Sequence, residues 1–151
     1  MAKNKLINIR GLDTKIDSDM TFRYKMQPIS VTMLRTKSAI VNISEVSQNL
    51  NRDPKMLIEF FKKKLGIPMN YNSKDNRVEF KGVVQSELQN ATYEFIQYYV
   101  LCPGCSNPET ILCKKKSKLY IRCKACSYND EVKTEPKIVS KTIDTITKLV
   151  T

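Results

Sequence analysis

The sequence predicts an α+β fold in which a small α/β module, built from a β-hairpin and helices, precedes a C-terminal β-ribbon with four paired cysteines. Apolar residues alternate over residues 29–43, which is typical of a hairpin with one buried face. They recur at helical spacing over 54–65 and 87–99, which indicates amphipathic helices. Two Cys-x-x-Cys turns then follow, with seventeen residues between them.

The two Cys-x-x-Cys turns predict one structural zinc ion. Structural zinc sites use four soft ligands in a tetrahedron, and the spacing between the turns lies within the range of four-cysteine sites. Four thiolates leave no open position for water and the chain has no histidine, which disfavours a catalytic zinc. The predicted ligands are Cys102, Cys105, Cys123 and Cys126.

Two disulfides, or cysteines without a ligand role, are the alternatives to the metal site. Disulfides are disfavoured because the cysteines number five and no secretory signal is evident. The fifth cysteine, Cys113, falls outside both turns, and we expect it to be a strand residue.

The net charge narrows the class of partner. Lysine and arginine number 26 against 15 acidic residues, so the formal charge is +11, which favours RNA, DNA or an acidic protein face. A solvated lysine surface is the alternative. Without histidine the usual acid–base and Ser-His or Cys-His chemistries are absent, so we do not expect an enzyme in its own right. No apolar run approaches the ~18 residues of a membrane span, so we expect a cytoplasmic protein that contacts no membrane.

The chain is expected to comprise four parts. The boundaries are a flexible tail over 1–21, the α/β domain over 22–99, the zinc ribbon over 100–134 and a C-terminal helix over 135–151.

The α/β domain begins with Phe22-Arg23-Tyr24-Lys25-Met26, where an arginine lies between two aromatic residues. In the hairpin that follows, Lys37 is predicted at the tip. Ser44 is expected to cap a helix that ends near Leu50.

Asp53 is expected to cap a second helix, with Pro54 at its first position and Gly66 at its end. The helix pair resembles a helix-turn-helix, but the second helix is mostly apolar on its inner face, which disfavours DNA reading. Residues 70–75 predict a polar loop and 77–81 a strand. The C-terminal helix is expected to dock on the chain itself.

Together these motifs resemble the shared domain of translation initiation factor 5 and the beta subunit of initiation factor 2. The resemblance covers about residues 21–127, and the combination of motifs is specific. The segments that carry it are Phe22-Arg23-Tyr24-Lys25-Met26, Ala39-Ile40-Val41-Asn42-Ile43, Leu50-Asn51-Arg52, Tyr99-Val100-Leu101-Cys102-Pro103-Gly104-Cys105, Asn107-Pro108-Glu109-Thr110 and Cys123-Lys124-Ala125-Cys126.

Within this family the chain is similar to a short factor 5-like protein, equivalent to the N-terminal half of factor 5. The segment around Arg23 and the stretch Lys137-Ile138-Val139 resemble factor 5. By contrast, Asp53-Pro54-Lys55-Met56-Leu57 and Thr110-Ile111-Leu112 are closer to the beta subunit.

The resemblance implies a monomeric accessory protein that binds initiation factor 2, through its gamma or beta subunit, with the small ribosomal subunit and initiator tRNA. In factor 5 the arginine of the entry motif promotes GTP hydrolysis on initiation factor 2, which implies an arginine-finger role in trans for Arg23. The alternative is a beta-subunit-like component that binds the gamma subunit, initiator tRNA or RNA without activating GTP hydrolysis.

Eight basic side chains are candidates for contact with a protein partner or RNA. A third hypothesis is a zinc-ribbon nucleic-acid binder that acts outside initiation, in which the ribbon lysines follow phosphates. The candidates are Lys25, Lys37, Lys114, Lys115, Lys116, Lys118, Arg122 and Lys124.

Overall fold

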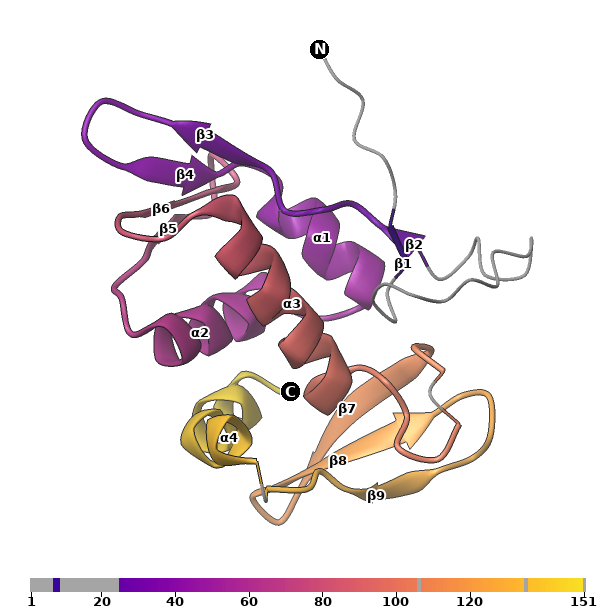
Figure 1. Cartoon of the computed structure of the whole chain (residues 1–151). Coiled ribbons are helices and arrows are strands. Elements are labelled where there is room, and N and C mark those ends of the chain that lie inside the picture. Colours follow the sequence, from indigo (N-terminus) through magenta and orange to yellow (C-terminus); the bar gives the residue numbers. More distant parts are fainter. Residues whose placement is uncertain (1–6, 9–24, 106, 135, 151) are drawn as a thin grey trace.

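The computed structural model describes residues 7–8, 25–105, 107–134 and 136–150 of the 151-residue chain. It shows the predicted α+β fold (Figure 1). The elements in chain order are β1 (Ile7–Asn8), β2 (Lys25–Met26), β3 (Val31–Met33), β4 (Ser38–Ile40), α1 (Ile43–Leu50), α2 (Pro54–Leu65), β5 (Asn70–Asn72), β6 (Arg77–Phe80), α3 (Gln85–Tyr99), β7 (Thr110–Lys115), β8 (Lys118–Cys123), β9 (Asn129–Glu131) and α4 (Lys137–Leu149).

The strands form three antiparallel sheets, and the helices lie between the two larger ones (Figure 1). One sheet has the order β3-β4-β6-β5 and the ribbon has the order β7-β8-β9. The pair β1-β2 joins Ile7 and Asn8, from the predicted tail, to the first strand of the α/β domain. No helix in the described part of the chain is long and apolar enough to cross a membrane.

The predicted hairpin is present, but its second strand is shorter than the alternation suggested. Val31 pairs with Ile40, and β4 ends there. Val41 is exposed because the chain turns at Asn42 into α1. The Asn42 side chain accepts a hydrogen bond from the Ser30 N–H and donates one to the Pro28 carbonyl, each at 2.9 Å. Asn42, not Ser44, is the N-cap residue of α1, and its side chain holds the preceding segment instead of capping a helix N–H.

The second helix follows its local sequence signals. The Asp53 carboxylate accepts a hydrogen bond from the Lys55 N–H at 2.8 Å, and Pro54 opens α2. Gly66 ends α2 with a φ of 67°, a left-handed conformation that glycine adopts without steric strain.

The predicted polar loop after α2 contains a strand. Residues Asn70–Asn72 form β5 and pair with β6. The Asn72 side-chain oxygen accepts a hydrogen bond from the Lys74 N–H at 3.0 Å and so stabilises the turn between the two strands. Because backbone pairing with β6 stabilises β5, the strand does not require alternating apolar side chains.

The core lies where α3 crosses α2. The buried apolar residues of α3 are Leu88, Ala91, Phe95, Ile96 and Tyr99, and three aromatic rings from the two helices meet at its end. Phe60 lies edge-on to Phe95 at 5.5 Å between ring centroids and to Tyr99 at 6.1 Å. Edge-to-face contacts of this kind stabilise the packing beyond the burial of their area.

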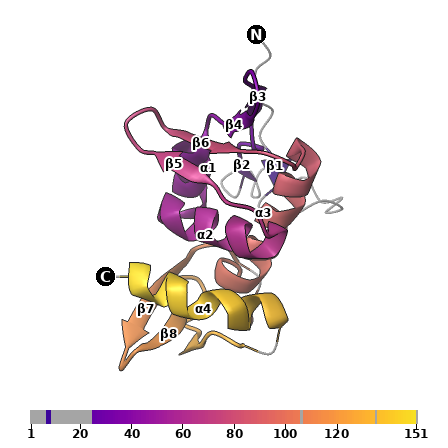
Figure 2. The same cartoon turned by 90° about the vertical axis from the view of Figure 1, so that its left-hand side faces the viewer.

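The C-terminal helix docks on the chain itself, as predicted. Figure 2 shows α4 lying across the molecule between α2 and the ribbon, and it contacts both α2 and β8. Val139 and Ile146 are fully buried, and the Thr142 hydroxyl lies 2.7 Å from the Tyr99 hydroxyl. Burial raises the pKa of Tyr99 to about 12, so its hydroxyl stays protonated at neutral pH.

A buried guanidinium joins the helical layer to the ribbon. Arg52, in the turn between α1 and α2, is 8% exposed and makes five hydrogen bonds, which use all its N–H donors. The acceptors are the carbonyls of Asn51, Tyr99 and Thr110 and the Thr110 hydroxyl. Burial lowers the pKa of Arg52 to about 10, so the group remains charged at neutral pH.

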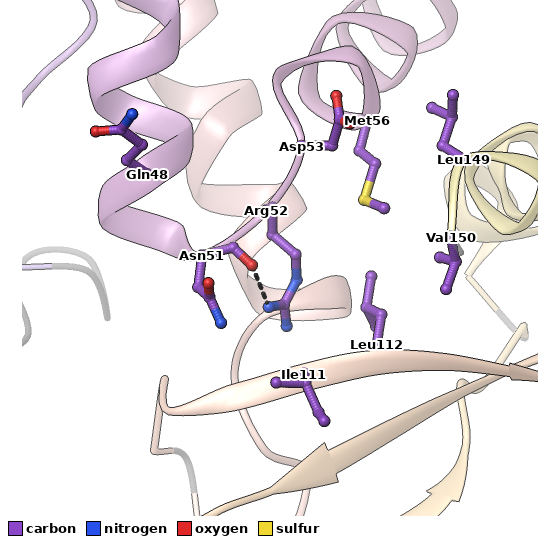
Figure 3. A pocket seen from close by; sticks show the side chains of 9 residues that line it. All are labelled: Gln48, Asn51, Arg52, Asp53, Met56, Ile111, Leu112, Leu149 and Val150. Atoms are coloured by element: carbon purple, nitrogen blue, oxygen red, sulfur yellow. Dashed lines mark hydrogen bonds between the residues drawn. The ribbon is translucent and has the colours of Figure 1, made fainter.

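A pocket of about 450 Å³ lies beside this guanidinium, between the α1–α2 turn, β7 and the end of α4 (Figure 3). Ile111 and Leu112 border it from β7, and Leu149 and Val150 border it from the C-terminal end of the chain. Since the Arg52 donors are already occupied, the side chain has no N–H free for a ligand in this pocket. We therefore assign Arg52 a structural role.

We predict that Arg52→Lys lowers the free energy of unfolding by about 2–4 kcal/mol, because an ammonium cannot reproduce the planar fork and buried acceptors lose their donors. Urea unfolding followed by circular dichroism measures the change. Arg35→Lys, at an exposed position of the hairpin turn, is the matched control and should change stability by less than about 0.5 kcal/mol. Equal effects of the two substitutions would contradict the role assigned to Arg52.

Candidate metal centre

The ribbon brings the four predicted cysteines together. Their sulfur atoms all lie within 4.8 Å of one another, and Cys102 and Cys123 are buried whereas Cys105 and Cys126 are exposed. The Cys102–Cys126 and Cys105–Cys123 sulfur pairs are 3.6 and 3.7 Å apart. Tetrahedral zinc with Zn–S bonds of about 2.3 Å requires sulfur separations of about 3.8 Å. The sulfur positions therefore fit one tetrahedral ion.

The two Cys-x-x-Cys turns, which we call the knuckles, have matching backbone hydrogen bonds. The Gly104 N–H donates to the Cys102 sulfur and the Ala125 N–H donates to the Cys123 sulfur, each at 3.2 Å. Hydrogen bonds to a sulfur stabilise its thiolate form, which is the form that binds metal. The sulfurs of Cys102 and Cys123 thus each accept a hydrogen bond from the backbone N–H two residues later.

A second matching pair of bonds closes each knuckle. The Cys102 N–H donates to the Asn107 carbonyl at 3.0 Å, and the Cys123 N–H donates to the Tyr128 carbonyl at 2.8 Å. Burial raises the pKa of the Cys102 thiol, but hydrogen bonds from the backbone and neighbouring cysteines outweigh burial and leave the pKa below its ordinary value. For Cys105 and Cys126, backbone hydrogen bonds lower the pKa, but burial and the neighbouring cysteines raise it more, to about 12 for Cys105. A metal ion would therefore have to displace protons from these two thiols.

Gly104 lies where the first knuckle approaches the second. A Cβ atom at this position would lie 3.3 Å from the Tyr128 ring, a tight approach, and in ordinary contact with the sulfurs of Cys102 and Cys126 at 3.6 and 3.8 Å. A side chain here would therefore require the Tyr128 ring to shift by a few tenths of an ångström.

Cys113 lies in β7 opposite Tyr120, as the sequence predicted for a strand residue. It is not part of the group of four cysteines. Its side chain is half-buried on the outer face of the ribbon, the face turned away from α4.

The basic residues of the ribbon do not all share one face. Residues opposite one another in an antiparallel pair point to the same side, so the register places Lys115 and Lys118 on the outer face with Arg122. Lys114 lies opposite Leu119, whose side chain is buried, and so belongs to the inner face. The run of lysines is therefore divided between the two sides of the ribbon.

Lys116 and Lys124 lie in turns. Lys116 and Ser117 both have positive φ, at 51° and 68°, which is the conformation of a tight type I′ hairpin turn. Lys124 follows β8, and its N–H donates to the Glu109 carbonyl at 2.9 Å. Lys118 lies 4.0 Å from Glu131 of the neighbouring strand.

The two basic candidates of the α/β domain are placed differently. Lys37 lies in the hairpin turn, as predicted, and its ammonium forms an ion pair with Glu79 of β6. Lys25 is the first residue of β2. Arg23, the predicted arginine finger, lies outside the described residues.

Sequence reasoning missed Arg52 as the link between the two parts of the fold. Arg52 entered the sequence-based prediction only as part of a segment that resembles the family. Its structural role was not predicted, because its acceptors are mainly backbone carbonyls up to 58 residues away. The one signal in the sequence is that Arg52 lies between two helices and has no acidic residue three or four positions away with which to pair.

Comparison with known proteins places the chain in a family. A family model, described as the domain found in initiation factors 2B and 5, matches residues 14–129. Eukaryotic translation initiation factor 5 of Caenorhabditis elegans is 32% identical over 126 residues, which cover 80% of this chain and 29% of that protein. The Saccharomyces cerevisiae factor 5 is 32% identical over 128 residues, covering 81% of this chain and 32% of that protein.

Archaeal relatives have a length closer to that of this chain. Translation initiation factor 2 subunit beta of Thermofilum pendens is 34% identical over 112 residues, which cover 74% of this chain and 78% of that protein. The chain thus spans less than a third of these factor 5 relatives and most of the archaeal subunit. It belongs to the family of translation initiation factors that share the domain of initiation factor 5 and the beta subunit of initiation factor 2.

Proposed function

We propose that this chain is a factor 5-like accessory protein that binds initiation factor 2 in the preinitiation complex and stimulates its GTP hydrolysis through Arg23. The observation that carries the proposal is the family membership, combined with the segment Phe22-Arg23-Tyr24-Lys25-Met26, which resembles the entry motif of factor 5. The chain itself would perform no catalysis, and its arginine would complete the site of another protein.

The anchoring of the chain just after this segment supports the proposal. The Gln27 N–H donates to the Asn49 side chain of α1 at 2.9 Å, and the Ile29 N–H donates to the Gln89 side chain of α3 at 2.8 Å. Arg23 precedes the first of these anchors by four residues in the sequence. An arginine finger acts from a fixed domain, since its planar cation must meet the phosphoryl oxygens as charge develops there.

We predict that Arg23→Ala abolishes the stimulation of GTP hydrolysis, a loss of about 10³–10⁵-fold if Arg23 acts as arginine fingers do elsewhere. Arg23→Lys should restore little, because an ammonium lacks the bidentate geometry. The measurement is single-turnover hydrolysis by initiation factor 2 loaded with GTP and initiator tRNA on small ribosomal subunits. Arg10→Ala, which removes another arginine near the N-terminus, should retain full stimulation. Wild-type rates with Arg23→Ala would exclude the finger.

A beta-subunit-like component is the second candidate, and the 34% identity to the Thermofilum pendens beta subunit over 112 residues favours it. Such a component would bind the gamma subunit stably and would contact initiator tRNA or RNA without activating hydrolysis. The outer face of the ribbon suits RNA, because Lys115, Lys118 and Arg122 share it with Tyr120. Cations beside an aromatic ring bind both phosphates and bases.

We predict that the chain and the isolated gamma subunit do not co-elute at micromolar concentration in gel filtration, because a GTPase-activating protein engages its target transiently. A mixture containing the complete initiation factor 2 is the comparison. A stoichiometric complex with the gamma subunit that survives the column would establish the beta-subunit-like role instead.

We also propose that the metal of the ribbon is a single structural zinc ion, because four thiolates in a closed tetrahedron match the zinc preference and leave no position for substrate. Cys102, Cys105, Cys123 and Cys126 would hold it. The ion would order the ribbon and present its basic face.

We predict about one zinc per chain by metal analysis, lost in Cys123→Ser and retained in Cys113→Ser, which removes a thiol outside the cluster. Metal binding in such sites contributes folding free energy, so chelation should disorder the ribbon. The ribbon amide resonances should then lose their dispersion in a two-dimensional NMR spectrum. A metal-free chain with an unchanged ribbon spectrum would refute the proposal.

A further inference from the structure

Two hollows adjoin where α4 begins. The first, of about 580 Å³, lies between the end of α2, α3 and the start of α4. The second, of about 430 Å³, lies between the end of α3, the first knuckle and β8. Both are lined by Gln97, Tyr98 and Pro136, so the two hollows are neighbours, and together we call them the α3–α4 groove.

The first half of the α3–α4 groove is strongly basic. Four lysines and one carboxylate line it. The carboxylate, Glu94, is paired with Lys64 at 3.0 Å. In the described part of the chain, Lys63, Lys137 and Lys141 form no ion pair. Three ammonium groups are therefore available to an anionic ligand.

Two of these lysines are arranged in a row. Lys137 and Lys141 lie one turn apart on α4, about 6 Å along its axis, and both belong to the N-terminal part of this 13-residue helix. The positive end of the helix dipole adds to their charge there. Asp144 lies on the next turn but does not line the groove. A ligand with successive negative charges could place one beside Lys137 and the next beside Lys141.

The second half of the groove is apolar and aliphatic. Leu101, Pro103, Ile121 and Val132 form most of its wall, and the half-buried Tyr98 lies at the junction with the basic half. The polar or charged residues that also line it are Gln97, Cys102 and Lys133. Single-stranded nucleic acid binds to aromatic rings on which successive bases stack. Among the described lining residues Tyr98 is the only aromatic one, so the aliphatic wall suits a leucine-like or phenylalanine-like side chain better than a row of bases.

From these two halves we propose that the α3–α4 groove binds a segment of a partner protein in which acidic residues flank a large apolar side chain. The apolar side chain would enter the aliphatic half, and the carboxylates would meet Lys63, Lys137 and Lys141. Such a surface lies outside the Arg23 segment and the outer face of the ribbon, so the proposal stands or falls independently of the proposed GTPase role.

Selection from a phage-displayed library of random peptides, each about a dozen residues long, tests this groove on the full zinc-loaded chain. The expected consensus has at least two acidic residues beside a large apolar one. The selected peptides are then synthesised with a fluorescent label, and fluorescence anisotropy measures their affinity for the chain. Replacing the apolar residue by serine, or the acidic residues by glutamine, should each weaken binding roughly tenfold, and added salt should weaken it through the charges.

Matched variants of the chain locate the binding site. Lys137→Glu with Lys141→Glu should weaken the selected peptides at least roughly tenfold, because the row of charges is reversed. Lys74→Glu with Lys81→Glu makes the same change in net charge at exposed positions near β6 and should leave the affinity within about twofold. Thermal unfolding shows that each variant is folded. If the first pair unfolds, Lys137→Ser with Lys141→Ser replaces it and must give the same ranking.

Three results would overturn the proposal. One is the absence of any acidic and apolar consensus. Another is a selected peptide that binds the Lys137 and Lys141 variants as tightly as the unaltered chain. The third is an oligouridylate of about a dozen nucleotides that binds more tightly than every selected peptide and loses affinity in the same variants, since the groove would then be a nucleic-acid site.

Discussion

The architecture depends on a cation that is buried without a carboxylate. Among the described residues Arg52 forms no ion pair; it donates instead to backbone carbonyls at the end of α3 and the start of β7. Carbonyls at the end of a helix have no intrahelical partner, so the Tyr99 carbonyl needs a donor from elsewhere. The Thr110 hydroxyl, which accepts from Arg52, also donates to the Val100 carbonyl. A guanidinium suits this task because it has five donors in one plane and is weakly hydrated, so the loss of water costs it less than it would cost an ammonium.

Tyr99 connects this polar joint to the apolar core. Its carbonyl accepts from Arg52, its hydroxyl meets Thr142 of α4, and its ring stacks on Phe95 at 5.3 Å between centroids. One residue at the end of α3 therefore contacts the α1–α2 turn, the last helix and the core. The ribbon begins directly after Tyr99, so the first knuckle follows a residue that contacts three other parts of the fold. The ribbon that carries the four cysteines is thus joined to the helices through this residue.

Much of this arrangement was predictable from the sequence, and the exceptions have physical reasons. Asp53, Pro54 and Gly66 define α2 because helix-end chemistry is local, and the cysteine spacing defines the knuckles for the same reason. Strand β5 was not predictable, since Asn-Tyr-Asn has no apolar alternation and forms a strand only by pairing with β6. The Arg52 joint and the α3–α4 groove were not predictable either, because residues far apart in the sequence create both.

The position of α4 makes the ribbon an insertion rather than a terminal module. The ribbon is flanked by the last residue of α3 and the first turns of α4. These two flanks are fixed to one another by the hydrogen bond between Tyr99 and Thr142. Residues 100–136 thus form a closed loop, and closing a flexible loop of this length costs on the order of 3 kcal/mol more than closing one of a single residue. Ordering of the ribbon by its three strands removes that freedom in advance. Whatever orders the ribbon therefore also strengthens the contact between α3 and α4, while Thr110 and the buried Leu119 and Ile121 attach the ribbon to the rest of the fold.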